Sequence, residues 1–202
     1  YPISNGVMNS LPVGKHRLIF YANDPCLNSS RDSLELQVKD KIAPQVRCDN
    51  AINVSVSNGY GRLTVADVDE GSSDNCQLQS LKVRRAVPAS CTMSFDQNGN
   101  GKLDTADALS LENGIFYTLP AERVDFFCCD IGSKVRVELI ATDAAGNTSK
   151  CWLDAPIEDK TLLQCAVPAD TNILCTDKIL ANLGAYGTAR VLNDPCGLLN
   201  IV

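Results

Sequence analysis

Apolar and polar residues alternate along short segments of the chain, and this alternation predicts β-strands. Three segments show it most clearly: residues 34–38, 135–141 and 153–157. In the second segment Val135 and Val137 would lie on one face and Arg136 on the other, as in a half-buried antiparallel strand. Turn-forming residues such as those at 143–147 separate the segments. The pattern therefore predicts an all-β protein.

The chain also repeats itself. Arg17 returns as Arg136, and the residues around it keep the same interval (136 − 17 = 119). A later block at 60–76 returns at nearly the same period at 186–196. Self-similarity at a fixed period indicates a tandem array of one module. The copies divide the chain into the C-terminal part of a first repeat at 1–40, a complete repeat at 41–159 and the N-terminal part of a third at 160–202.

Short strands separated by turns, in a module of this size, predict an immunoglobulin-like β-sandwich. The complete repeat carries an insertion at residues 86–125. Within it, the stretch from Ala106 to Glu112 has the composition of a short helix and ends at Asn113-Gly114, a common helix stop. The joints between repeats, at 40–44 and 159–161, are short, so we expect successive modules to form a stiff rod.

Composition narrows the possible partners and the compartment. Lysine and arginine number 18 against 24 acidic residues, for a net charge of −6, which argues against nucleic acid as a partner. No apolar run approaches the ~18 residues of a membrane span. Ten cysteines in a chain with one histidine indicate disulfides and not zinc. We therefore expect an extracellular or cell-surface protein.

We expect no enzyme activity from this sequence. His16 is the only histidine, and the repeat aligns it with Val135, so a partly buried ring is expected there. Without a second histidine no Ser-His-Asp set can form in this window. Trp152 adjoins Cys151 on a predicted strand, and we expect it to pack in the core against a disulfide and not to offer a sugar-stacking surface.

The sharpest chemical signal is a loop at residues 96–107, inside the insertion. An EF-hand-type calcium loop needs oxygen ligands at positions 1, 3 and 5, glycine at 6, a backbone carbonyl at 7, often a water-mediated ligand at 9 and a carboxylate at 12. The corresponding residues are Asp96, Asn98, Asn100, Gly101, Lys102, Asp104 and Asp107. The loop resembles the calcium loops of dockerin modules, which accept Asp at position 12. We expect a structural calcium here, with an Asn- and Gly-rich surface turn as the alternative.

A second acidic cluster precedes Cys76. Asp67, Asp69 and Asp74 lie close together in the sequence, next to a predicted joint. Their carboxylates would either chelate calcium between modules or serve as solvated turn residues, and both interpretations remain open.

Several motifs in combination resemble the hyalin-type repeats of very large bacterial cell-surface proteins. They are the segments 71–76, 142–151 and 159–160. That group includes the repeat-rich adhesins that gliding-type bacteria export by the type IX route. The resemblance implies an immunoglobulin-like sandwich, surface display and an adhesive or fibre-forming role without catalysis. Neighbouring repeats, and copies of the chain in a fibre, would be its partners.

The same resemblance implies a disulfide pattern. It pairs Cys48 with Cys76 and Cys128 with Cys151, which leaves Cys91 to pair with Cys129 and hold the insertion to the sandwich. Cys196 would pair with Cys165 or with Cys175, and Cys26 has no evident mate.

Together these features predict an extracellular structural or adhesive repeat protein that forms a stalk or filament. The alternative is an accessory binding module of a secreted enzyme, with catalysis in another part of that protein.

Overall fold

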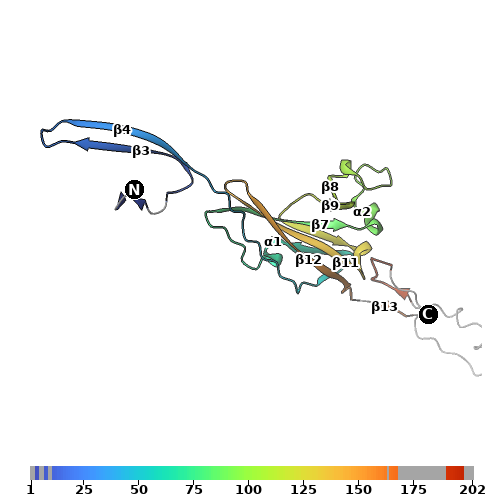
Figure 1. Cartoon of the computed structure of the whole chain (residues 1–202). Helices are drawn as coiled ribbons and strands as arrows, with labels where there is room; N and C mark the ends of the chain where they lie inside the picture. The colour runs from blue at the N-terminus through green and yellow to red at the C-terminus, as the bar shows by residue number, and fades with distance from the viewer. Residues whose placement is uncertain (1–2, 5–6, 9–10, 163, 168–189, 198–202) are drawn as a thin grey trace, which may run out of the picture.

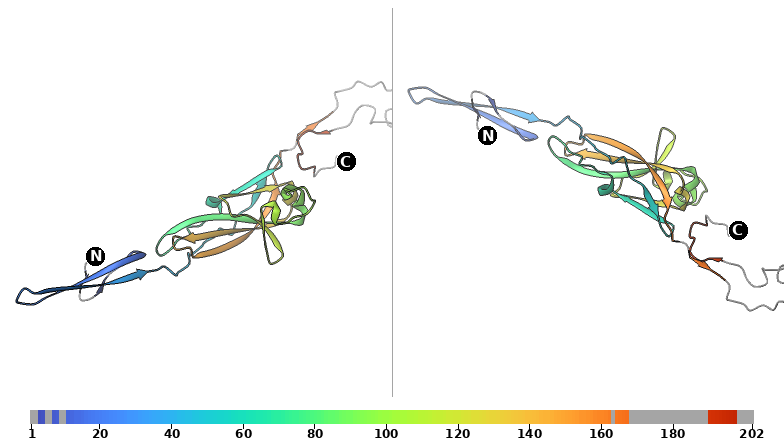
Figure 2. Two further views of the ribbon diagram at one scale, coloured as in Figure 1. Left: turned by 90° about the horizontal axis from the view of Figure 1, so that it is seen from above. Right: turned by 90° about the horizontal axis from the view of Figure 1, so that it is seen from below.

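The computed structural model describes residues 3–4, 7–8, 11–162, 164–167 and 190–197. A long N-terminal hairpin projects from one end of a central domain (residues 41–159), and the chain leaves from the opposite end (Figure 1). Views from above and from below, each turned by 90° from Figure 1, show the same extended arrangement (Figure 2). The described chain is mostly β-sheet, with few and short helices.

The hairpin consists of β3 (Gly14–Asn23) and β4 (Ser29–Val38), which pair antiparallel over ten residues each. Asp24 closes its turn by accepting hydrogen bonds from the backbone of Cys26 and Asn28. Two short strands, β1 (Ile3–Ser4) and β2 (Val7–Met8), pair ahead of it.

Two β layers make up the central domain. The larger is a six-stranded sheet in the order β5-β12-β11-β7-β9-β8. Its strands are β5 (Val54–Val56), β7 (Leu78–Val87), β8 (Leu109–Glu112), β9 (Ile115–Thr118), β11 (Lys134–Asp143) and β12 (Thr148–Asp159). The smaller layer pairs β6 (Tyr60–Thr64) with β10 (Arg123–Phe127). Only β5 and β12 run parallel among these pairs.

The core lies between the two layers. It includes residues of both: Val54, Val56, Leu63, Val83, Val124, Phe126, Val135, Val137, Leu139, Leu153, Ala155 and Ile157. The predicted alternation is confirmed here, because Val135, Val137 and Leu139 are buried on β11 while Arg136 between them is partly exposed. Hydrophobic burial of this one face specifies which side of each strand faces inward.

The expected helix at 106–112 is wrong. A 3-10 turn, η2 (Thr105–Asp107), is followed directly by strand β8, which pairs with β9. Ala108 takes a left-handed conformation (φ 57°) and ends the turn. Asn113 and Gly114 (φ 51° and 81°) then form the tight turn of a β-hairpin, where positive φ at both positions is favoured. The predicted helix stop is therefore a hairpin turn, and the insertion extends the main sheet.

Other short elements complete the described chain. They are α1 (Val65–Val68), η1 (Ala89–Cys91), α2 (Thr92–Phe95), η3 (Cys128–Asp130), β13 (Cys165–Ala166) and β14 (Arg190–Val191).

Three disulfides are present among the described residues: Cys48–Cys151, Cys91–Cys129 and Cys128–Cys196. The second confirms the prediction for the insertion. The pairs Cys48–Cys76 and Cys128–Cys151 are wrong, and so is the pairing of Cys196 with Cys165 or Cys175.

The physical reason for these corrections lies in the position of each sulfur. Cys151 faces inward on β12, opposite Leu139, and Cys48 packs against the same core. Cys76, by contrast, is exposed beside Asp40, and its sulfur accepts a hydrogen bond from Asn75. Cys175 lies outside the described residues, and Cys26, Cys76 and Cys165 are free thiols.

Candidate functional site: the insertion loop and the two joints

The insertion loop is closed by hydrogen bonds from its own backbone to Asp96. This carboxylate accepts from the backbone N–H groups of Gly99 (2.7 Å), Asn100 (3.2 Å) and Gly101 (2.6 Å). Gly99 and Gly101 have φ of 73° and 78°, a conformation that glycine adopts without strain. The first half of the loop therefore has the sharp turn that the sequence predicted around position 6.

The second half of the loop is organised by Asp107, which is fully buried. Its carboxylate accepts from the backbone N–H groups of Gln97 (2.9 Å), Asn98 (3.2 Å) and Asp104 (2.8 Å). The carboxylate of Asp104 in turn accepts from the side-chain amide of Asn100 (2.8 Å), which is the main reason why the pKa of Asp104 lies below its usual value. The carboxylates of Asp96, Asp104 and Asp107 are therefore all held by hydrogen bonds within this one loop.

The donor set of this loop fits calcium in its chemistry. Calcium prefers carboxylate, amide and backbone oxygens, and Asp96, Asn98, Asn100, Asp104 and Asp107 supply the first two kinds while Lys102 supplies a carbonyl. Within the described part of the chain, however, no three of the loop's acidic side chains bring oxygens within 4.8 Å of one another. The side-chain amides of Asn98 (3.2 Å) and Asn100 (2.8 Å) instead donate to Asp104. The side-chain oxygens of Asn98 and Asn100, the atoms that would bind calcium, accept from the backbone N–H groups of Asn100 (3.0 Å) and Lys102 (2.8 Å).

The second acidic cluster does not bring its three carboxylates together in the described structure, and for Asp67 and Asp69 this agrees with the turn-residue interpretation. Asp67 accepts from the backbone N–H of Thr64 at 2.7 Å and completes the cap of α1. Asp69 accepts from the backbone N–H of Ser72 at 2.8 Å. Hydrogen bonds to nearby backbone groups therefore hold the carboxylates of Asp67 and Asp69, whereas Asp74 lies beside Asp40 and Asp143.

Asp74 lies at the upstream joint, which we define as the contact of residues 11–13 and 40–42 with residues 74–77 and 143–147 of the central domain. There Asp74, Asp40 and Asp143 each bring a carboxylate oxygen within 4.8 Å of the other two. One Asp74 oxygen accepts from the backbone of Cys76 (2.9 Å), and within the described chain the other oxygen is buried without a hydrogen-bond partner. The sequence did not reveal this trio because its members are far apart in the chain.

Hydrogen bonds across the upstream joint are few and long. The Asn147 amide donates to the backbone carbonyls of Asp40 and Ile42, at 3.5 Å each, and also binds Asp143 at 2.7 Å. A shallow hollow beside them is lined by Leu11, Pro12, Val13, Asp40, Cys76, Gln77, Ala144 and Ala145. Partial desolvation, followed by the Asp40 carboxylate, raises the pKa of the Cys76 thiol.

At the downstream joint, residues 160–162, 164–167 and 190–197 meet the opposite end of the central domain. The Cys128–Cys196 bridge connects the two parts covalently. The backbone N–H of Lys160 donates to the carbonyl of Val56 (2.8 Å), and that of Asn58 donates to the hydroxyl of Thr161 (3.2 Å). This joint therefore combines a covalent bond with short hydrogen bonds.

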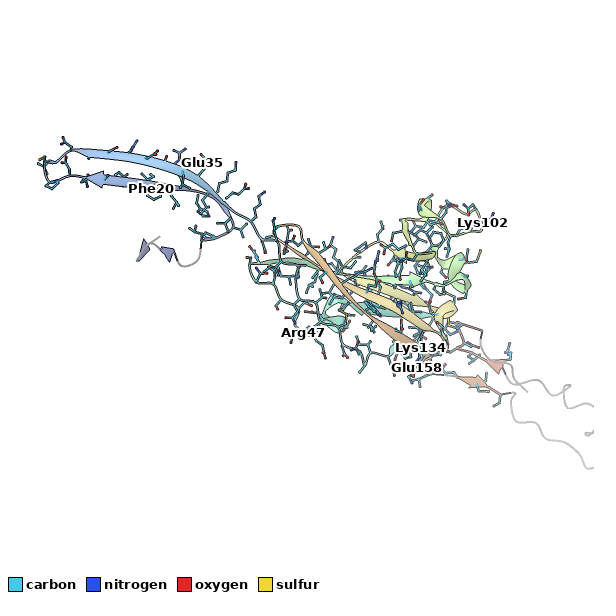
Figure 3. All side chains as sticks on the ribbon, in the orientation of Figure 1. Phe20, Glu35, Arg47, Lys102, Lys134 and Glu158 are labelled. Carbon is cyan, nitrogen blue, oxygen red and sulfur yellow. A yellow bond between two sulfur atoms is a disulfide. The ribbon has the colours of Figure 1, made fainter. Side chains whose placement is uncertain are left out.

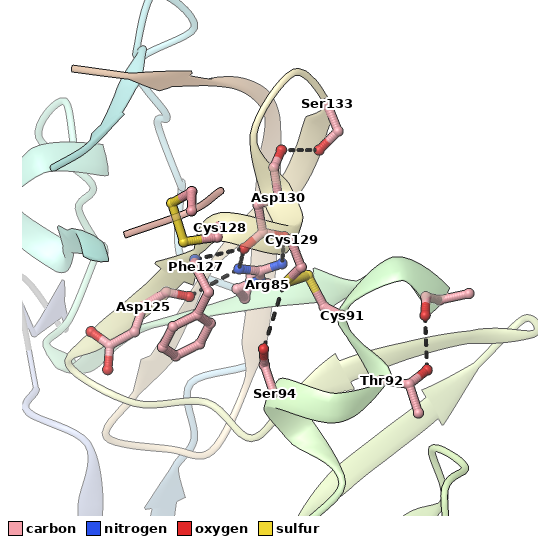
Figure 4. The surroundings of a disulfide bond; sticks show 12 residues. Arg85, Cys91, Thr92, Ser94, Asp125, Phe127, Cys128, Cys129, Asp130 and Ser133 are labelled. Atoms are coloured by element: carbon pink, nitrogen blue, oxygen red, sulfur yellow. Dashed lines mark hydrogen bonds and ion pairs between the residues drawn. A yellow bond between two sulfur atoms is a disulfide. The ribbon is translucent and has the colours of Figure 1, made fainter. Parts of the chain in front are cut away.

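A buried ion pair lies next to Cys128 and Cys129 (Figure 4). Arg85 and Asp130 are both fully buried, and the Arg85 guanidinium donates to the two Asp130 oxygens at 2.7 and 2.5 Å. Asp130 ends the same 3-10 turn that carries Cys128 and Cys129. Because Cys129 is bonded to Cys91 and Asp130 to Arg85, this sulfur and acidic group is a structural anchor and not a metal site.

Two further side chains can now be placed. His16 is partly buried, as expected, and its Nε2 lies 2.7 Å from the carbonyl of Pro12. Trp152 contradicts the prediction, because it is 56% exposed on the outer face of β12. Strand alternation explains this result: Cys151 points into the core, so its neighbour points out.

Comparison with known proteins adds no assignment: no protein-family model matches the chain, and no curated protein matches it. Among the described residues no helix is long and apolar enough to cross a membrane. The fold and its bridges define a β-rich, disulfide-bonded protein.

Proposed function

We propose that the chain is part of an extracellular stalk or filament made of tandem immunoglobulin-like repeats, with a structural and adhesive role and no catalysis. The observation that carries the proposal is the Cys128–Cys196 bridge, which connects the central domain to the chain that follows it. A covalent bond across a joint resists both bending and extension, which is the property that a load-bearing rod requires.

Matching geometry in the two long hairpins supports the tandem arrangement. Arg17 pairs with Glu35 across β3–β4, and Arg136 pairs with Asp154 across β11–β12, in the same register after the repeat interval (136 − 17 = 119 and 154 − 35 = 119). Both pairs are ion pairs, at 3.3 and 3.1 Å. Asp24 closes the first hairpin as Asp143 closes the second, each accepting at 2.8 Å from the backbone four residues on.

The bridges define the route by which tension would cross the molecule. With Cys48 bonded to Cys151, tension passes directly between these two residues. Without the Cys128–Cys196 bridge, tension then follows the 45 residues of chain from Cys151 to Cys196 (196 − 151 = 45). With the bridge, tension follows the 23 residues from Cys151 back to Cys128 (151 − 128 = 23) and passes through the disulfide to Cys196. Removing the bridge adds 22 residues (45 − 23 = 22), roughly 75 Å at ~3.4 Å per residue.

Single-molecule pulling of the oxidised protein tests this route. The Cys128→Ser/Cys196→Ser variant is expected to extend about 75 Å further than the natural sequence before its end-to-end length stops increasing. The Cys91→Ser/Cys129→Ser variant is the matched control, because its bridge does not shorten the route. Equal lengths for the natural and the joint variant would refute a load-bearing bridge.

Electron microscopy of the complete native protein separates the stalk from the alternative, an accessory module of a secreted enzyme. The proposal expects long, uniform fibres or stalks with a regular axial repeat. Compact particles that carry a short arm would favour the accessory module.

We also propose that the insertion loop binds calcium as a structural ion. Binding to the folded state alone raises stability by about 2.7 kcal/mol when free calcium is 100 times its Kd. Asp96→Asn with Asp104→Asn removes two charges and keeps one of the two acceptor oxygens at each position, so the calcium-induced rise in Tm should disappear. Asp32→Ala, on the exposed hairpin, is the control and should keep the rise. An identical Tm of the natural sequence in calcium and in chelator would exclude the ion.

A further inference from the structure

The outer face of the six-stranded sheet carries the exposed indole of Trp152. Its neighbour Cys151 points to the opposite side and forms the bridge to Cys48. Core packing therefore does not explain a tryptophan at this position. A large aromatic side chain that is 56% exposed on a regular strand is a candidate contact surface.

Polar side chains around Trp152 are held in place. The guanidinium carbon of Arg136 lies 5.9 Å from the centre of the indole ring. Arg136 also donates to Asp154 at 3.1 Å, while Lys150 contacts Glu138, the residue opposite Trp152 on β11, at 3.1 Å. Hydrogen-bond donors and acceptors therefore flank the ring in fixed positions, so a ligand would not have to order them.

A second row of contacts fixes this layer further. Arg84 donates to Glu138 at 2.7 Å and binds both oxygens of Glu112 at 2.5 and 2.7 Å. Its guanidinium also lies 4.4 Å from the centre of the Tyr117 ring. The polar layer under and beside Trp152 is thus a connected network and not a set of independent surface residues.

Charge on this face differs from that of the whole chain. The outer face carries the cations Lys82, Arg84, Lys134, Arg136 and Lys150 and the acids Glu112, Glu138, Asp154 and Glu158. Arg84, Arg136 and Lys150 pair with acids of this face. In the described structure neither Lys82 nor Lys134, which is labelled in Figure 3, forms an ion pair. The face therefore presents two cations without an ion-pair partner in a chain of net charge −6.

We propose that this face binds an acidic polysaccharide, with a sugar ring stacked on Trp152 and the sugar's carboxylate or sulfate groups paired with Lys82, Lys134 and Arg136. The C–H groups of a sugar ring carry partial positive charge and are attracted to the negative face of an indole. Charge-assisted hydrogen bonds then recognise the acidic groups. A sheet face offers its contacts in rows, which suits an extended polymer. The proposal deepens the adhesive part of the proposed function and rests on it, whereas the pulling experiment does not depend on it.

Trp152 is the only tryptophan of the chain, so its fluorescence reports on this face alone. Titration with polygalacturonate or with dextran sulfate should shift the emission and protect it from acrylamide quenching, and the two polymers distinguish carboxylate from sulfate recognition. Neutral dextran should have little effect. No change with either acidic polymer, at low ionic strength, would overturn the proposal.

Variants then separate stacking from charge, with binding measured by calorimetry. Trp152→Ala should weaken binding about tenfold or more, and Trp152→Phe should retain part of it. Tyr21→Ala, which removes an exposed aromatic residue from the hairpin, is the matched control and should bind normally. Lys82→Glu with Lys134→Glu should weaken binding and reduce its salt dependence. Unchanged Tm values show that each variant is folded.

Polyglutamate distinguishes a sugar site from a general polyanion surface. The proposal expects it to bind at least about tenfold more weakly than polygalacturonate, because it has no sugar ring to stack. Equal affinity for the two polymers, or full affinity in Trp152→Ala, would overturn the sugar-binding assignment.

Discussion

At the upstream joint Asn147 and Asn75 of the central domain donate long hydrogen bonds to Asp40, in the segment that follows the N-terminal hairpin, whereas at the downstream joint the central domain is bonded covalently through Cys128 and Cys196. The corresponding residues are otherwise alike. Asp159 accepts from the backbone two residues on, as Asp40 does, and the motif around Cys196 matches that around Cys76. One pair of cysteines therefore changes a polar contact into a covalent one.

The two joints differ because Cys196 has a cysteine partner in the preceding part of the chain and Cys76 has none. Cys196 reaches Cys128, but the position one repeat earlier than Cys128 is Asn9 (128 − 119 = 9), so Cys76 has no equivalent sulfur to meet there. Cys76 consequently remains a free thiol. In the proposed repeat arrangement, a cysteine at this position of the preceding repeat would supply the sulfur that Cys76 lacks.

The largest expected effect concerns the anchor of the downstream joint. Asp130→Ala removes one member of a fully buried ion pair and leaves Arg85 uncompensated, which should cost about 3–5 kcal/mol. Chemical denaturation measures the loss. Asp125→Ala breaks a half-exposed ion pair with Arg62 and is the control, with an expected loss within about 1 kcal/mol. Equal losses of unfolding free energy in the two variants would show that the Arg85–Asp130 pair is not a structural anchor.

The next effect separates stability of the domain from stiffness of the joint. Losing the Cys48–Cys151 bridge, by serine at both positions, should destabilise the central domain by about 4 kcal/mol, because the bridge closes a long loop. Losing Cys128–Cys196 should change the Tm of the central domain little and instead make residues 160–167 sensitive to protease. Thermal unfolding and limited proteolysis report the two outcomes, and the reverse pattern would contradict the distinction.

A smaller effect is expected when the aspartate that closes each of the two hairpin turns, Asp143 or Asp24, is replaced. Asp143→Ala leaves three donor groups at the upstream joint without their acceptor, and since Asp143 is fully buried the cost should be about 1–3 kcal/mol. Asp24→Ala removes the same hydrogen bonds from the exposed turn of β3–β4 and should cost less. Denaturant titration of both variants gives the difference, which should vanish if the joint adds nothing to the turn.

The smallest effect concerns thiol chemistry at the unbridged joint. Because the pKa of Cys76 is raised, less of it is thiolate at neutral pH, so its alkylation should be slow and should accelerate as pH rises. Asp40→Asn should speed the reaction at neutral pH by removing a neighbouring negative charge. Mass spectrometry of iodoacetamide-treated protein measures both rates. Alkylation of Cys128 or Cys196 without a reductant would contradict the assignment of bridged and free sulfurs.

Period-2 alternation predicted strands β4, β11 and β12. β11 and β12 each bury one face, whereas β4 forms a strand although Leu34 is exposed and Leu36 and Val38 are only partly buried. The helix at 106–112 was wrong because composition does not show that Ala108 adopts positive φ and that Asn113-Gly114 turns a hairpin. The predicted pairs all lay within one repeat, as Cys91–Cys129 does, whereas Cys128–Cys196 crosses a joint. The trio of Asp40, Asp74 and Asp143 was missed for the same reason, since its members meet only through the tertiary structure.

Peptide mapping under non-reducing conditions, on protein whose free thiols are blocked at purification, tests the central claim most directly. The Cys91→Ser/Cys129→Ser variant leaves Cys128 as the only cysteine of its peptide, so its partner can be assigned without ambiguity. A Cys128 peptide bonded to the Cys196 peptide is the predicted result. A bond from Cys128 to Cys151, with Cys196 bonded to Cys165 or Cys175, would place every bridge within one repeat and contradict the covalent joint.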